Sequence, residues 1–193
     1  MSNKLIILDR DGVINLDSDQ YIKSPEEWIP IQSSLRAIAN LNREGYKVAV
    51  ATNQSGIARE KFDTTTLAMI HKKMELVLAN VGAHINALEY CPDHPNQAGP
   101  NRKPNTGMVN KLLILFDADA SETWFVGDSI SDLQCASSAG CKGVLVLTGN
   151  GKNTIGDPAF NKNTPVFQDL DSFVEQLISA GKNNLPSGSL TNK

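Results

Sequence analysis

The chain has 193 residues, of which 40% are hydrophobic and 20% are charged, which suits one well-buried core and is short for two. Its 18 basic and 21 acidic residues give a net charge of -3, so no basic surface for nucleic acid is expected. No apolar stretch approaches the ~18 residues that a membrane span needs, and the three cysteines, an odd number, make no disulfide framework. We expect a cytoplasmic protein without membrane or nucleic-acid partners, monomeric by default, with one domain over 1–181 and a flexible tail over 182–193.

Short aliphatic runs alternate with helical periodicity along the chain, which is typical of βαβ units that build a parallel sheet. Strands are expected at 4–8, 46–51, 85–90, 123–126, 143–147 and, at an edge, 166–167. Helices are expected at 35–41, 67–81, 108–116, 133–139 and 170–178, the first capped by Ser33 or Ser34 and the second by Asp63 or Thr64. The predicted fold class is α/β and Rossmann-like, with a central parallel sheet, helices on both faces and no large cap domain.

The segment 13–30 is too polar and irregular for a helix, yet it carries Tyr21, Ile22, Trp28 and Ile29. A loop this long in a compact domain is usually functional or mobile. We interpret it as a small flap beside the functional site. The alternative is a surface excursion that Trp28 fastens to the core.

Asp9 and Asp11 directly follow the buried run Leu5–Leu8, in the order Asp9-Arg10-Asp11-Gly12. The carboxyl end of a parallel strand is where open α/β sheets bind their ligands. Two carboxylates held close repel each other, and a bound divalent cation relieves that repulsion. The pair therefore indicates a metal site, although an isolated motif of this kind serves as often to cap a turn.

Three further segments at predicted strand ends suit a phosphate. Thr52 and Asn53 follow the second strand, Arg102 and Lys103 precede the helix at 108–116, and Asp128 follows the fourth strand. Hydroxyl, amide and cationic groups bind phosphate oxygens, and another carboxylate can complete a metal shell. Each segment alone is ordinary turn chemistry, but together and in this order they are specific.

These segments resemble the four signatures of the haloacid dehalogenase (HAD) superfamily of phosphotransferases, as Asp9-x-Asp11-Gly12, Thr52, Lys103 and Gly127-Asp128-x-x-x-Asp132. Within that superfamily, the runs 9–15, 52–59, 91–92 and 102–104 are similar to the D-glycero-D-manno-heptose 1,7-bisphosphate 7-phosphatases and to the histidinol-phosphate phosphatases. The resemblance covers about residues 4 to 150 and implies a HAD fold.

The resemblance implies Mg²⁺-dependent hydrolysis of a phosphomonoester through an aspartyl-phosphate. It makes Asp9 the nucleophile and Asp11 the general acid and base, protonated when substrate binds. It implies that Mg²⁺ is bound by Asp9, by the backbone carbonyl of Asp11 and by Asp128. It assigns the remaining roles as follows: Thr52, Asn53, Gln54 and Ser55 bind the transferring phosphoryl group, catalytic Lys103 braces it, Arg102 reaches the far end of the substrate, and Asp132 orients Lys103 or Ser129.

Many members of this family carry a structural zinc site before the Arg-Lys-Pro motif, made by a Cys-x-His pair and a Cys-x-Cys pair. Here the first half reads Cys91-Pro92-Asp93-His94, and Pro100-Asn101 stands where the second pair is expected. Tetrahedral zinc sites need four nitrogen or sulfur ligands. We therefore predict that zinc is absent and that Cys91 packs against the core. Because the shorter loop carries Arg102, we expect its change to affect substrate specificity and not the hydrolytic step.

The leading hypothesis is a heptose bisphosphate 7-phosphatase in the route to the heptoses of bacterial surface polysaccharide. One alternative is a phosphatase of histidinol phosphate or another small metabolite, and another is a non-catalytic module that binds phosphosugars. A P-loop kinase is disfavoured because no G-x-x-x-x-G-K-[ST] motif occurs.

Several polar residues are given no functional role. His71 and His84 are predicted on the surface, away from the strand ends. The segment 148–164 is predicted to be a polar loop, in which Gly149, Gly151 and Lys152 face solvent; the alternative is that these three residues contact substrate.

Overall fold

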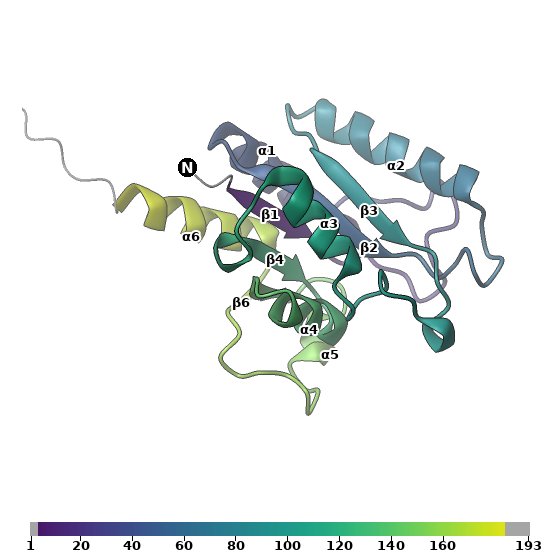
Figure 1. The fold of residues 1–193 in the computed structure, drawn as a ribbon. Coiled ribbons are helices and arrows are strands. Elements are labelled where there is room, and N and C mark those ends of the chain that lie inside the picture. Colours follow the sequence, from purple (N-terminus) through teal and green to yellow (C-terminus); the bar gives the residue numbers. More distant parts are fainter. Residues whose placement is uncertain (1–3, 184–193) are drawn as a thin grey trace, which may run out of the picture.

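The computed structural model describes residues 4–183, which form one six-stranded parallel sheet with helices on both faces (Figure 1). The strand order is β3-β2-β1-β4-β5-β6, and every adjacent pair is parallel. The elements in chain order are β1 (Leu5–Leu8), α1 (Gln32–Arg43), β2 (Lys47–Asn53), α2 (Thr64–Ala79), β3 (Ala87–Cys91), the 3-10 turn η1 (Pro95–Gln97), α3 (Gly107–Phe116), η2 (Ala120–Glu122), β4 (Trp124–Gly127), α4 (Ile130–Ser138), β5 (Lys142–Val146), α5 (Gly151–Thr154), β6 (Val166–Phe167) and α6 (Leu170–Asn183).

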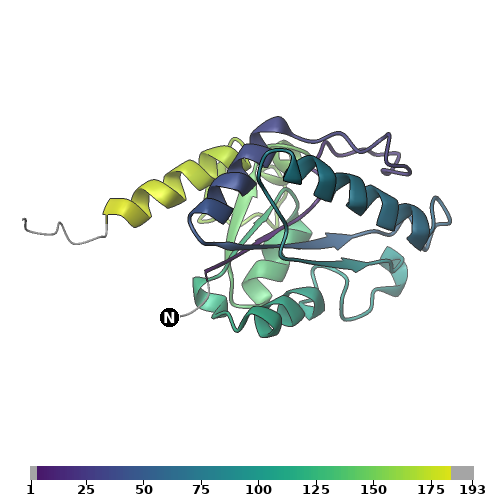
Figure 2. The same ribbon diagram turned by 90° about the horizontal axis from the view of Figure 1, so that it is seen from above.

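The central strand β1 explains the three layers. All four of its residues are buried, and successive side chains point to opposite faces of the sheet. Ile6 and Leu8 pack in the core beneath α1, α2 and α6, whereas Leu5 and Ile7 pack beneath α3 and α4. Figure 2 shows the two helical layers on either side of the sheet. The predicted fold class is confirmed.

Helix starts were predicted with mixed success. Asp63 caps α2 by accepting a hydrogen bond from the Thr66 amide at 2.7 Å, as expected. The cap predicted for α1 is wrong: the helix begins at Gln32 after Ile31, which makes no side-chain cap. The Ser34 hydroxyl instead donates to the Val13 carbonyl at 2.6 Å, so it ties the start of the predicted flap to the helix.

The end of the chain and the loop before it also differ from expectation. The predicted loop 148–164 contains the short helix α5. Helix α6 continues through Asn183, beyond the predicted boundary at 181, and the rest of the predicted tail lies outside the described residues. Within 4–183, no helix is both long enough and apolar enough to cross a membrane.

The predicted flap is anchored at one end. Trp28 is fully buried, and the Lys73 ammonium of α2 donates to the carbonyls of Pro25 at 2.6 Å and Trp28 at 2.9 Å. The other part of the segment borders the cavity described below, through Asp17, Ser18, Asp19, Tyr21 and Ile22. The segment is thus fastened to the core by Trp28 and also lies beside the site.

Candidate active site

The carboxyl ends of β1, β2 and β4 meet at one edge of the sheet, where a cavity of about 400 Å³ opens. The winding of the chain reverses between β1 and β4, and such a switch point is where open α/β sheets bind ligands. Asp9 follows β1 and Asp128 follows β4, so the two acids flank this point. The lining residues are Asp9, Asp11, Asp17, Ser18, Asp19, Tyr21, Ile22, Asn53, Gln54, Ser55, Lys103, Asp128, Ser129, Ser131 and Asn150.

Lys103 is the buried cation of this site. Its ammonium lies 2.9 Å from Asp9 Oδ1 and 2.7 Å from Asp132 Oδ1, and the Lys103 and Asp132 side chains are each only 1% exposed. Burial alone would lower the pKa of Lys103, but the charges of Asp132 and Asp9 outweigh it and raise that pKa. The lysine therefore remains charged.

Asp132 orients both of its candidate partners. Besides its ion pair with Lys103, its Oδ2 accepts hydrogen bonds from the Ser129 amide at 3.1 Å and the Ser129 hydroxyl at 2.6 Å. The bond from the Ser129 amide, together with the Asp132 amide that donates to Ser129 Oγ at 3.4 Å, forms a capping box at the start of α4. Asp132 therefore contacts both of the residues that it was predicted to orient, Lys103 and Ser129.

Three carboxylates converge at the cavity. Ligand oxygens of Asp9, Asp128 and Asp132 all lie within 4.8 Å of one another. Burial raises the pKa of Asp9 to about 7, with Lys103 opposing the shift, and burial together with the charges of Asp132 and Asp9 raises the pKa of Asp128 to about 8. Two buried acids and the partly buried Asp9 face one lysine, and an all-oxygen donor set of excess negative charge fits a hard divalent cation such as Mg²⁺.

Two glycines allow the backbone to approach Asp128. Gly12 has a φ of +77° and Gly149 a φ of +55°, and a Cβ on either would lie 2.1 Å from Asp128 Oδ2. The Asn150 amide donates to the same oxygen at 2.7 Å, and the Thr154 hydroxyl donates to the Asp128 carbonyl at 2.7 Å. Gly151 and Thr154 are buried, so the prediction of a plain solvent loop is wrong for them, whereas Gly149 and Lys152 are exposed as predicted.

The Asp11 carboxylate is held apart from the acid cluster. It accepts three hydrogen bonds from the Arg10 guanidinium at 2.9 to 3.0 Å, one from Asn15 and one from Gln54, each at 2.9 Å. Burial alone would raise the pKa of Asp11, but Arg10 and the amide donors outweigh it and lower that pKa. The side chain is thus ionised here, whereas the expected role as general acid requires it to be protonated when substrate binds.

The residues at the carboxyl end of β2 and directly after it divide into two kinds. Asn53, Gln54 and Ser55 line the cavity, whereas Thr52 is 1% exposed and its hydroxyl accepts a hydrogen bond from Gln54 at 2.9 Å. The Asn53 side chain donates to the Lys103 carbonyl at 3.1 Å and accepts from the Lys103 amide at 3.0 Å. Asn53 therefore fixes the backbone that carries the lysine.

Arg102 lies outside the residues that line this cavity. Its guanidinium donates to the Asp93 carbonyl at 2.9 Å, and its pKa is lowered by burial, with the nearby charge of Arg59 adding to the effect. In the same loop, Asp93 accepts a hydrogen bond from Gly99 and His94 accepts one from Asn96. Cys91 is buried, and burial raises the pKa of its thiol.

The predicted absence of zinc is not tested by these contacts and stays a prediction. Across 4–183, the one group of three acidic, histidine or cysteine side chains placed to share a metal is Asp9, Asp128 and Asp132. The loop from Cys91 to Arg102 contributes nothing to it.

The prediction for His71 is wrong. This histidine of α2 is half buried, and its Nε2 lies 3.2 Å from Nη1 of Arg10, whose side chain is fully buried beside Asp11. Sequence reasoning missed Arg10 as well. The available signal was an arginine between two acids in a segment that had to be buried, which requires partners for its five N–H groups. His84 is exposed, as predicted.

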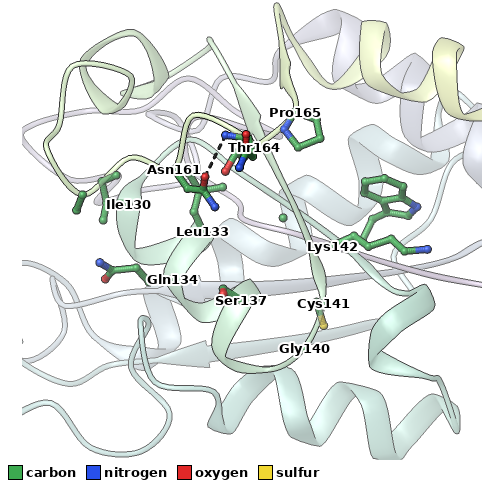
Figure 3. Close-up of a pocket in the computed structure, with 14 residues that line it drawn as sticks. Ile130, Leu133, Gln134, Ser137, Gly140, Cys141, Lys142, Asn161, Thr164 and Pro165 are labelled. Carbon is green, nitrogen blue, oxygen red and sulfur yellow. Dashed lines mark hydrogen bonds between the residues drawn. The ribbon is translucent and has the colours of Figure 1, made fainter.

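A larger cavity, of about 640 Å³, lies between α4 and the segment 159–165 (Figure 3). Gln134 and Ser137 of α4 and Asn161 and Thr164 of the loop face it. None of the described residues that line it is acidic. Its size therefore does not make it the chemical centre, which lies in the smaller cavity.

Comparisons with known proteins agree with this geometry. The HAD-hydrolase-like family model matches residues 100–173. The chain is 47% identical over 178 residues to the D-glycero-beta-D-manno-heptose-1,7-bisphosphate 7-phosphatase of Pseudomonas aeruginosa, covering 92% of this chain and 99% of that one. It superposes with a TM-score of 0.89 on the D,D-heptose 1,7-bisphosphate phosphatase of B. bronchiseptica, which was solved with magnesium and phosphate. The two chains are 47% identical, and the match covers 92% of this chain and 99% of that one. A corresponding enzyme from Burkholderia thailandensis is 40% identical, with a TM-score of 0.73, over 92% of this chain and 99% of that chain.

The parallel sheet with its acid cluster at the switch point is that of a HAD-type phosphatase. At this level of identity, over nearly the full length of both chains, the assignment goes further. The chain belongs to the D-glycero-D-manno-heptose-1,7-bisphosphate 7-phosphatase family.

Proposed function

We propose that this chain removes the 7-phosphate of D-glycero-D-manno-heptose 1,7-bisphosphate by Mg²⁺-dependent hydrolysis through an aspartyl-phosphate. The observation that carries the proposal is the placement of Asp9 at the switch point, 2.9 Å from Lys103 and grouped with Asp128. The choice of substrate is based on the relatives at 47% identity, whose names specify the β anomer. These relatives favour the heptose bisphosphate over histidinol phosphate.

Asp9 is suited to attack phosphorus. The Arg10 amide donates to its Oδ1 at 2.7 Å, and Lys103 approaches the same oxygen, which leaves Oδ2 as the attacking atom. As the new bond from Oδ2 to phosphorus forms, the bond from phosphorus to the sugar oxygen breaks and Asp11 protonates that oxygen. Asp11 then removes a proton from the water that hydrolyses the aspartyl-phosphate.

Asp9, Asp128 and the Asp11 backbone carbonyl would hold Mg²⁺ at the cluster. Bound there, the ion would supply charge neutralisation to the phosphoryl oxygens. Lys103 adds a fixed positive charge, and Asp132 and Asn53 keep that lysine in place.

The phosphoryl group would be bound by the end of β2 and the residues that follow it. Asn53, Gln54 and Ser55 line the cavity, and Thr52 lies beneath Gln54 and supports it. Arg102, with Arg59 nearby, would bind the second phosphate, because two neighbouring cations suit a dianion at the far end of the substrate.

The test is hydrolysis of a panel of phosphorylated metabolites with Mg²⁺, including both anomers of the heptose bisphosphate and histidinol phosphate. The β-heptose bisphosphate should give the highest kcat/KM, because losing a phosphate contact costs orders of magnitude. Asp9→Asn should lose turnover by at least about a thousandfold, whereas Asp157→Asn, on an exposed loop, should not. Wild-type activity in Asp9→Asn would refute the mechanism, and no activity in the wild-type chain would favour a non-catalytic module.

We propose further that the enzyme works in the cytoplasm as a monomer, without nucleic-acid or membrane partners. The three cysteines are free and buried, which suits a reducing compartment, and the net charge is -3. Light scattering measures the mass in solution, and a dimer would contradict the monomer.

A further inference from the structure

Arg10 is a fully buried charged side chain within the motif that carries both acids. Its Nε lies 3.0 Å from Asp11 Oδ1, and its Nη2 lies 2.9 Å from both Asp11 oxygens. This geometry fixes the plane of the carboxylate, because a guanidinium and a carboxylate pair in a planar fork. The position of Asp11 therefore depends on where the guanidinium is held.

The guanidinium is held from the other side by His71. Nε2 of this histidine lies 3.2 Å from Arg10 Nη1. Burial and the charge of Arg10 lower the pKa of His71 to about 4, so the ring is neutral at physiological pH. Nε2 then accepts the hydrogen bond from Arg10, and the ring proton sits on Nδ1.

Helix α2 fixes the histidine in turn. His71 follows Ile70, a fully buried residue of the helix, and its ring packs in a T-shaped arrangement with that of Tyr90 on β3, with 6.1 Å between centroids. The neutral His71 ring accepts a hydrogen bond from Arg10 but carries no charge, so it does not weaken the ion pair between Arg10 and Asp11. The chain of contacts runs from α2 through His71 and Arg10 to Asp11.

We propose that His71 is a positioning residue that acts through Arg10 to hold the Asp11 carboxyl where it can protonate the leaving sugar oxygen. The inference rests on the proposed function, because it assigns Asp11 the acid role in that reaction. Small displacements of a catalytic group have large effects on rate, so losing the acceptor slows the step that needs the proton.

A change of leaving group separates this role from a structural one. A sugar alkoxide needs a proton as its bond to phosphorus breaks, whereas p-nitrophenolate leaves without one. The constant kcat/KM reports only the steps up to formation of the aspartyl-phosphate. Measuring it for heptose bisphosphate and for p-nitrophenyl phosphate, both with Mg²⁺, therefore isolates the acid function of Asp11.

The variants form a matched set. His71→Gln places an amide oxygen near the position of Nε2, whereas His71→Asn is too short to reach Arg10, and both are polar residues on the same helix. His84→Asn makes the same change at an exposed turn. Asp11→Asn gives the pattern expected when the acid itself is lost.

His71→Asn should lose about tenfold or more in kcat/KM for the heptose bisphosphate and less than about threefold for p-nitrophenyl phosphate. His71→Gln should recover most of the loss, and His84→Asn should match the wild type. Equal losses on both substrates, a wild-type rate in His71→Asn, or no recovery in His71→Gln would overturn the inference while the proposed function stands. A wild-type chain that hydrolyses neither substrate would overturn both.

Discussion

Lys103→Met would remove the cation that pairs with Asp9 and Asp132 beneath the cavity. The side chains of Lys103 and Asp132 are each 1% exposed, so water cannot solvate the Asp132 carboxylate once it has lost its cationic partner. Breaking a buried ion pair by removing one partner costs about 3–5 kcal/mol. For a chain of this size each kcal/mol lowers the melting temperature by about 2–4 °C, so a fall of about 10 °C is expected.

The cost should depend on pH. Asp9, which pairs with Lys103, has its pKa raised to about 7, and Asp128, which is grouped with Asp9, has its pKa raised to about 8. Groups whose pKa is raised on folding bind protons in the folded state, so their penalty is smallest at low pH and grows as pH rises through those values. The loss in Lys103→Met should therefore be larger at about pH 9 than at about pH 5, measured by thermal and urea unfolding with EDTA present.

Two further variants sharpen this test. Lys142→Met removes an exposed ion pair with Glu122 and should change stability by less than about 1 kcal/mol. Lys103→Met combined with Asp132→Asn removes both charges of the buried pair and should regain at least half of the loss. A single variant as stable as the wild type at high pH, or a double variant less stable than the single one, would refute the reasoning.

Three other predictions concern the metal and the substrate. Mg²⁺ should bind more tightly as pH rises from about 6 to about 9 and release protons, because it displaces them from Asp9 and Asp128; calorimetry in two buffers of different ionisation enthalpy measures this. Gly149→Ala should weaken Mg²⁺ binding at least about tenfold, because its Cβ would lie 2.1 Å from Asp128 Oδ2. Gly45→Ala has no heavy atom within 4 Å of its new Cβ, so it should leave Mg²⁺ binding unchanged in the same titration. Arg102→Ala should lower kcat/KM at least about tenfold for the bisphosphate but much less for the 7-monophosphate, as steady-state kinetics on both will show.

Each of these has a clear contrary result. Heats that do not depend on the buffer would mean that Asp9 and Asp128 are already ionised without metal. Wild-type Mg²⁺ affinity in Gly149→Ala would mean that Asp128 is not a ligand. Equal losses on both substrates in Arg102→Ala would place this arginine elsewhere than at the second phosphate.

The sequence was sufficient to predict the sheet and the two acids that flank its switch point. Asp9 and Asp128 each follow a short apolar strand, and parallel strands bring their carboxyl ends to one edge whatever the details of packing. Lys103 was found from its motif, and the resemblance also implied that Asp132 orients Lys103 or Ser129, but only the structure shows that Asn53 holds the backbone of the lysine. Local pattern thus identified residues whose place depends on topology alone.

Contacts between elements distant in sequence could not be predicted in this way. His71 and Arg10 are 61 residues apart, and helical periodicity does not say which turn of α2 passes the end of β1. The approach of Gly149 to Asp128 depends on how a loop without periodic pattern folds back over β4. Ser34 was expected to cap α1, but a tertiary hydrogen bond to Val13 took its hydroxyl.

The most direct test of the mechanism is chemical trapping of the intermediate. The wild-type enzyme, mixed with the heptose bisphosphate and Mg²⁺, is quenched during turnover and reduced with borohydride, which converts an aspartyl-phosphate to homoserine. Peptide mass spectrometry should find homoserine at position 9 and unmodified aspartate at position 11. Conversion at another residue, or none at Asp9 during active turnover, would contradict nucleophilic attack by Asp9.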